Sequence, residues 1–202
     1  MAAEPILEDF DRALLSPELR WWNPPLRAEI RDSRLIVATR ANTDFWQRTH
    51  YGFRADNGHC LLARWTGDLV LSTFVRFRAV HQYDQAGLIV RLSPECWLKT
   101  SIEYEPDGAN RLGAVVTNGG WSDWSTQDVP KSMAAIALRV RREGADYTVE
   151  HADAREPRAW SQMRIAHLAA DDGGVVECGL YACSPKGEGF VAEFEHLSVQ
   201  PR

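Results

Sequence analysis

The sequence predicts an all-β fold, a sandwich or jelly roll built from two antiparallel sheets. Short apolar or alternating segments recur at regular spacing along the 202 residues, and clusters of Gly, Pro, Asn and Asp separate them. The pattern lacks the strand–helix–strand alternation that is typical of a parallel sheet. It also lacks a linker, repeat or low-complexity segment, so residues 1–202 are expected to form a single domain.

The elements follow in chain order, beginning with residues 1–19, which are expected to form an N-terminal extension. Only residues 5–19 could hold a helix, and that helix would be short. The clearest strand covers residues 69–77, because its apolar residues recur at every second position and share one face. The other predicted strands are 34–39, 86–92, 96–105, 112–117, 134–142, 147–151, 158–167, 175–183 and 190–199.

Charge and hydropathy exclude several classes of function. The 23 basic and 28 acidic residues give a net charge of −5, which argues against a protein that binds nucleic acid through a basic surface. No apolar run approaches the ~20 residues of a membrane span, and the acidic N-terminus does not resemble a secretion signal. We therefore expect a cytoplasmic protein with neither a nucleic-acid nor a membrane partner.

Four cysteines, Cys60, Cys96, Cys178 and Cys183, are too scattered to indicate a disulfide framework. Zinc would need two close pairs of ligands, and only the last two cysteines approach that spacing. Calcium would need an Asp-rich loop, which the sequence lacks. We therefore expect buried free thiols and neither a metal nor another cofactor.

Polar residues line one face of the predicted strand at 96–105. Alternation gives two sets: Trp97, Lys99, Ser101, Glu103 and Glu105 on the first face, and Leu98, Thr100, Ile102 and Tyr104 on the second. The second face is expected in the core. The first is compatible with a solvated sheet face that carries a Lys–Glu pair, or with the lining of a site. The chain has 20 Arg and only 3 Lys, so lysine is an unusual choice at position 99. The pKa of a partly buried lysine shifts readily, which favours the lining of a site over a solvated face.

Two further segments combine aromatic rings with acids and amides: TDFWQRTHYGF at 43–53 and NGGWSDWS at 118–125, which is expected to be a glycine-rich loop. Asp84 and Gln85 stand at the start of another strand. Concave binding sites use this mixture, in which rings stack on a ligand and polar groups fix its hydroxyls. The alternative is structural: the tryptophans would cap the core, His50 would be a satisfied histidine, and Asp84 would accept N–H bonds in a turn.

The chain resembles the uncharacterised family grouped with the fungal regulation-of-enolase protein, within the concanavalin-A-like lectin/glucanase superfamily. Five segments carry the resemblance in order and spacing: TDFWQRTHYGF, DNGHCLL, YDQAGLIVRLSPECWLKTSIEYE, VVTNGGWSDWS and CGLYACSPKGEGFVAEF. The resemblance extends from about residue 21 to residue 199. It implies a jelly-roll β-sandwich with one concave face, and it implies little about activity.

The preferred function is binding of a small carbohydrate or sugar-like ligand on the concave face. The candidate ligand-binding residues are Asp44, Trp46, His50, Asp84, Gln85, Trp97, Lys99, Glu103, Asp123 and Trp124. Five of these, from three separate segments, are expected to converge on one cavity: Asp44, His50, Lys99, Glu103 and Asp123.

Two alternatives remain open, and the sequence leaves undecided whether the protein is an enzyme. A glycoside hydrolase would use Glu103 and Glu105, with Lys99 and His50 as further catalytic candidates. However, Pro106 breaks the Glu-x-Asp-x-Glu pattern of superfamily relatives that cut β-glucans, because proline cannot donate to the sheet. The second alternative is a regulatory module that binds a protein partner.

Overall fold

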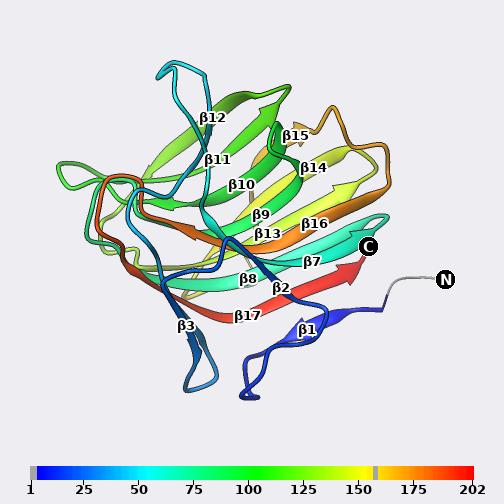
Figure 1. Cartoon of the computed structure of the whole chain (residues 1–202), viewed down its shortest axis with the longest axis horizontal. Helices are drawn as coiled ribbons and strands as arrows, with labels where there is room; N and C mark the ends of the chain where they lie inside the picture. The colour runs from blue at the N-terminus through cyan, green and yellow to red at the C-terminus, as the bar shows by residue number, and fades with distance from the viewer. Residues whose placement is uncertain (1–3, 157–158) are drawn as a thin grey trace.

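The computed structural model describes residues 4–156 and 159–202, and within these ranges it contains strands and no helix. The strands form two antiparallel sheets stacked as two layers, together with one short hairpin (Figure 1). The predicted all-β sandwich is therefore confirmed. The predicted start of a strand at residue 158 lies outside the described residues.

In the described part of the chain, one layer is an eight-stranded sheet. Its order is β15 (Ser161–His167), β14 (Asp146–Asp153), β13 (Ala135–Glu143), β8 (Leu69–Arg78), β17 (Val191–Pro201), β4 (Leu35–Ala38) and β3 (Arg27–Ile30), with β1 (Ile6–Glu8) paired to β17. The other layer is a seven-stranded sheet of the order β12 (Trp121–Val129), β11 (Asn110–Asn118), β10 (Cys96–Glu103), β9 (Gln85–Ser93), β16 (Val175–Cys183), β7 (His59–Thr66) and β2 (Arg20–Trp22). The hairpin consists of β5 (Phe45–Gln47) and β6 (Arg54–Asp56).

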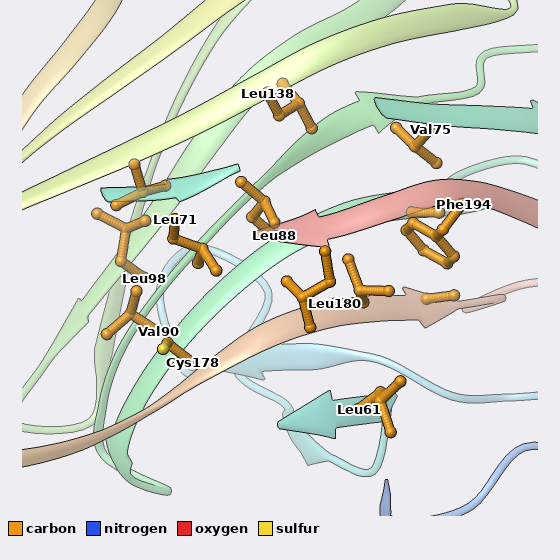
Figure 2. Packing of buried hydrophobic residues seen from close by; sticks show 14 of the residues in the cluster. Leu61, Leu71, Val75, Leu88, Val90, Leu98, Leu138, Cys178, Leu180 and Phe194 are labelled. Carbon is orange, nitrogen blue, oxygen red and sulfur yellow. The ribbon is translucent and has the colours of Figure 1, made fainter. Parts of the chain in front are cut away.

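Apolar side chains from the two sheets meet between the layers and form the main core. Figure 2 shows Leu88 of β9, Leu98 of β10 and Leu180 of β16 in this interior together with Val75 of β8 and Leu138 of β13. All five side chains are buried. The main core therefore joins strands that are distant in the sequence.

Strand β10 shows the predicted alternation. Leu98 and Ile102 are fully buried in the main core, whereas Trp97 belongs to a second apolar cluster on the outer face of the seven-stranded sheet. Tyr104 is only half-buried and lies outside both clusters, because β10 ends at Glu103, two residues earlier than predicted. The register is therefore as predicted, and only the end of the strand is wrong.

The N-terminal segment is not helical. Ile6–Glu8 forms β1, and the Glu8 carboxylate accepts hydrogen bonds from the backbone N–H groups of Phe10 at 3.0 Å and Ser16 at 2.8 Å. Phe10 is fully buried in the main core. Pairing with β17 and burial of Phe10 therefore outweigh any local helical preference.

The glycine-rich segment 118–125 is mostly a strand. Gly119 and Gly120 form a tight turn with positive φ angles of 56° and 75°, after which β12 starts at Trp121 and pairs with β11. The structure also contains strands that the sequence pattern did not indicate, namely β1, β2, β3, β5, β6 and β7.

Candidate functional site

The short hairpin β5–β6 lies over the outer face of the seven-stranded sheet, and we call it the covering hairpin. In Figure 1 the loop that carries it, coloured from blue to cyan, rises beside β11 and β12. Phe45 packs edge-on against Trp97 and Tyr181, with ring centroids 5.9 Å and 6.2 Å apart. An ion pair of 2.6 Å between Asp56 and Arg91 ties the hairpin to β9. The covering hairpin therefore removes a row of polar and aromatic side chains from solvent.

A cavity of about 490 Å³ opens between the covering hairpin and the sheet, within the size range of small-molecule sites. Four of its polar lining residues interact with one another: Asp44, Gln85, Lys99 and Glu103. The aromatic part of the lining consists of Trp46, Tyr51, Phe53, Tyr83 and Trp124. Lys186, which is exposed, also lines it.

Lys99 is the buried cation of the cavity. Its Nζ donates to Gln85 Oε1 at 2.7 Å and to Asp44 Oδ1 at 3.4 Å, and it lies 5.7 Å from the centre of the Tyr181 ring. Burial acts to lower the pKa of Lys99, but the Asp44 carboxylate, with smaller contributions from Cys183 and Glu103, raises it overall. Lys99 is therefore charged at neutral pH, and two of its three N–H donors are occupied.

Glu103 differs from its neighbours because its carboxyl group has no hydrogen bond to any described residue, although it is only 7% exposed. Burial raises the pKa of Glu103 to about 7, with Lys99 acting against this shift and Asp44 and Glu105 adding to it. The cavity therefore contains a carboxyl group that gains or loses a proton near neutral pH.

The remaining polar groups of the cavity are held by further hydrogen bonds. Gln85 Oε1 accepts from the Tyr181 hydroxyl at 3.0 Å as well as from Lys99, and its Nε2 donates to the Tyr83 carbonyl at 3.0 Å. Asp44 Oδ1 accepts from the backbone N–H of Phe45 at 2.7 Å. These bonds fix the orientation of both side chains before any ligand binds.

The structure brings six of the ten predicted ligand-binding residues to this cavity: Asp44, Trp46, Gln85, Lys99, Glu103 and Trp124. They come from the loop before β5, from β5 itself and from β9, β10 and β12. Of the five charged or basic groups predicted to converge, three do so. His50 and Asp123 do not line the cavity.

His50 and Asp123 lie outside the cavity for different reasons. His50 is exposed in the loop of the covering hairpin, where its ring lies edge-on 4.7 Å from Tyr51. Asp123 follows Ser122 and precedes Trp124 on β12, so alternation directs it to the opposite side of the strand from Trp124. There it forms a 2.9 Å ion pair with Arg164.

Asp84 and Trp97 are structural. Asp84 is fully buried and accepts from the backbone N–H groups of Val80 at 2.9 Å and His81 at 2.8 Å, and from the Ser184 hydroxyl. Trp97 is fully buried beneath the covering hairpin, with its indole N–H donating to the Pro94 carbonyl at 3.2 Å. As in the structural alternative, Asp84 therefore accepts N–H bonds in a turn, and Trp97 is part of a buried apolar cluster.

Glu105, the predicted partner of Glu103, acts on the Glu103 pKa but lies outside the cavity. Glu105 follows the end of β10, does not line the cavity, and accepts a 2.9 Å hydrogen bond from Gln82 Nε2. Strand alternation therefore no longer places it beside Glu103. The second carboxylate of the cavity is Asp44.

Sequence reasoning missed several lining residues. Tyr51 and Phe53 belong to the quoted segment 43–53, so their aromatic character was the available signal. Tyr83 and Lys186 also belong to quoted family segments, but only the fold brings their loops beside the covering hairpin.

Three other features bear on the class of site. All four cysteines are buried and free, as predicted. Across residues 4–156 and 159–202, no three His, Cys, Asp or Glu side chains cluster in a way that could bind a metal ion. The same residues include no apolar helix of membrane-spanning length.

Comparison with known proteins shows the family. Residues 21–202 match the family model described as a protein of unknown function (DUF1349). The chain belongs to the DUF1349 family. This DUF1349 chain is 33% identical over 181 residues to Regulation of enolase protein 1 of Saccharomyces cerevisiae, and the match covers 89% of this chain and 87% of the yeast protein. The resemblance carried by the sequence motifs is therefore confirmed.

Solved structures agree with the fold. A crystal structure of a functionally unknown protein from Saccharomyces cerevisiae has a TM-score of 0.83 and 30% identity, and covers 92% of this DUF1349 chain and 97% of that chain. The GH43 BlXynB protein from Bacillus licheniformis has a TM-score of 0.77 at 14% identity, over 97% of this chain and 39% of that chain. A xylan beta-1,4-xylosidase from Bacillus halodurans has a TM-score of 0.74, also at 14% identity, over 99% of this chain and 40% of that chain. These last two likenesses concern the fold alone.

Proposed function

We propose that this DUF1349 chain binds a small polyhydroxylated ligand, a sugar or sugar derivative, in the cavity. The observation that carries the proposal is Glu103, a carboxyl group that lines the cavity, is more than nine-tenths buried, and makes no hydrogen bond to any other described residue. This carboxyl group faces the cavity, where a ligand hydroxyl would donate a hydrogen bond to it.

The rest of the cavity suits the same ligand class. Lys99 keeps one N–H donor available, Asp44 and Glu103 supply acceptors, and Trp46 and Trp124 supply flat apolar faces. A sugar ring presents hydroxyl groups at its edge and C–H groups on its faces, so it can use both parts of the lining. Lys99 and Asp44 form an ion pair inside the cavity, and the lining also includes the exposed Lys186.

The fold adds weaker support. Structural neighbours with the same sandwich include a xylan beta-1,4-xylosidase, but the low identity makes this an analogy of fold. The proposal therefore depends on the cavity itself.

Titration of a sugar panel tests the proposal. A ligand of about a dozen non-hydrogen atoms at ~0.3 kcal/mol per atom would bind with a Kd of about 1 mM, so NMR or calorimetry at ~50 mM sugar is suitable. Lys99→Met should abolish binding, and Asp123→Asn, which changes an exposed residue outside the cavity, should leave the Kd unchanged. Absence of binding by every sugar in the panel would contradict the proposal.

A second candidate function is hydrolysis of a glycosidic bond, favoured by the Glu103 pKa of about 7. A carboxyl group with this pKa can donate a proton to a leaving group at neutral pH, and Asp44 is a second carboxylate in the same cavity. Aryl glycosides provide the assay. Release of the aryl alcohol by wild type and by Glu105→Gln, but not by Glu103→Gln, would support hydrolysis. A wild type that binds sugar without turnover would restrict the function to binding.

A further inference from the structure

We infer that the ligand of the cavity is a sugar chain of at least two rings, with one ring on the polar lining and the next against Tyr51 and Phe53 at the mouth. This inference rests on the proposed function and names the ligand class that the same site would take.

The first observation is a continuous series of aromatic contacts that leads out of the cavity. Ring centroids lie 6.4 Å apart between Trp124 and Trp46, 5.4 Å between Trp46 and Tyr51, and 6.2 Å between Tyr51 and Phe53. Trp46 is 7% exposed and Trp124 is half-buried, whereas Tyr51 and Phe53 are 52% and 45% exposed. A ligand confined to the interior would leave about half of the last two rings in water, whereas a longer chain would cover them.

The second observation is that the loop which presents these two rings is fixed. The Arg48 N–H donates to the Phe53 carbonyl at 2.8 Å, the Gly52 N–H donates to the Arg48 carbonyl at 2.7 Å, and the Trp46 indole N–H donates to the Thr49 carbonyl at 3.0 Å.

Two non-glycine residues of this loop have left-handed backbone angles, with φ of 57° at Arg48 and 62° at His50. Such conformations cost energy and persist where the surroundings hold them. The His50 ring lies against Tyr51, so the loop holds the exposed tyrosine in position rather than leaving it free. Preorganised rings lose little entropy when a ligand binds.

The third observation concerns charge. Arg48 and Arg54, the two cations of the covering hairpin near the mouth, both approach Glu95 Oε1, at 3.7 Å and 3.9 Å, and Arg48 also lies over the Trp121 ring. These contacts engage both guanidinium groups. Lys186, an exposed cation of the lining, has no such partner among the described residues, so the lining offers one cation to a charged substituent on the sugar chain.

The test compares a monosaccharide with its dimer and trimer in two series: xylose, xylobiose and xylotriose, and glucose, cellobiose and cellotriose. Covering about 55 Å² of aromatic surface at ~25 cal/mol per Å² corresponds to about tenfold tighter binding by the dimer. In Tyr51→Ala/Phe53→Ala the ratio of monomer to dimer Kd should fall below about twofold, because the surface that the second ring covers is gone.

Two further variants complete the design. Ile165→Ala removes an exposed apolar side chain on β15 of the other sheet and should keep the full gain. Tyr51→Leu/Phe53→Leu keeps part of the apolar area without flat rings, so its gain should lie between those of wild type and the alanine variant, and it replaces the alanine variant if that one folds poorly.

The outcomes separate the two proposals. Wild type that binds monomer and dimer equally would overturn the sugar-chain inference and leave the proposed function intact. Loss of monomer and dimer affinity to the same extent in a folded double variant would also overturn it, because the rings would then support the fold of the site. Absence of binding by all six sugars would overturn both proposals.

Discussion

Replacing Glu103 with Gln tests whether the fold holds a carboxyl group in the cavity at a cost in stability. Burial raises the pKa of Glu103 from 4.5 to about 7 in the folded chain. Between pH 4.5 and 7 the folded protein therefore keeps a proton that the unfolded chain has released. The free energy of unfolding falls as pH rises through this window, and the loss is complete above pH 7.

The magnitude follows from the same two pKa values. At about 1.4 kcal/mol per pH unit, the interval between 4.5 and about 7 lowers the stability of wild type at pH 8 by about 3 kcal/mol. Gln has nearly the same shape and carries no charge at any pH. Glu103→Gln should therefore be about 3 kcal/mol more stable than wild type at pH 8 and nearly equal to it at pH 4.5. Urea unfolding followed by tryptophan fluorescence at both pH values measures the difference.

Glu105→Gln is the matched control, because its carboxylate lies outside the cavity and already accepts a hydrogen bond from Gln82. Its stability relative to wild type should not show the gain at pH 8. The reasoning is refuted if Glu103→Gln is less stable than wild type at pH 8. That result would mean that attraction to Lys99 exceeds the cost of burying the Glu103 charge.

Two further predictions concern the main core and a buried ion pair. Ile102→Ala should lower the free energy of unfolding by ~2–5 kcal/mol, because Ile102 is fully buried between the sheets. Ile165 is exposed, so Ile165→Ala should change the free energy of unfolding by less than ~0.5 kcal/mol. Equal losses in the two variants would contradict the β10 register. Arg142→Met should cost ~3–5 kcal/mol because it leaves Asp171 buried without its 2.8 Å partner. The double variant Arg142→Met/Asp171→Asn should recover part of that loss. Chemical denaturation of wild type, both single variants and the double variant measures the coupling, and additive losses of stability would refute it.

The features that the sequence predicted well depend on local backbone geometry. In a strand, successive side chains point to opposite faces whatever the rest of the chain does, so the positions of Ile102 and Glu103 on opposite faces of β10 followed from spacing alone. The same rule would have separated Asp123 from Trp124. Gly119 and Gly120 indicate a loop, and strand alternation does not hold in a loop. In the structure the two glycines form only the turn, and β12 begins at Trp121.

The burial of the site depends on contacts between distant segments. Lys99 and Glu103 are buried because the covering hairpin, more than 40 residues earlier in the chain, packs Phe45 onto the same sheet face. Nothing in the alternation of β10 distinguishes a covered face from a solvated one. For the same reason Trp97, expected to face a ligand, instead forms the floor beneath Phe45.

Two buried carboxyl groups that serve the fold, Asp84 and Asp171, differ from Glu103, which lines the cavity. Asp84 accepts two backbone N–H bonds and a serine hydroxyl, and Asp171 accepts from Arg142, from the Tyr147 hydroxyl and from the backbone N–H of Gly173. Both groups are thus satisfied by the chain, as buried carboxylates in stable folds are. Glu103 is buried to a similar extent, yet its carboxyl group accepts nothing from the described residues and opens into the cavity. An uncharged glutamine would avoid the cost of burying a charge at this position, and the ligand that we propose would supply a hydrogen-bond donor to the glutamate.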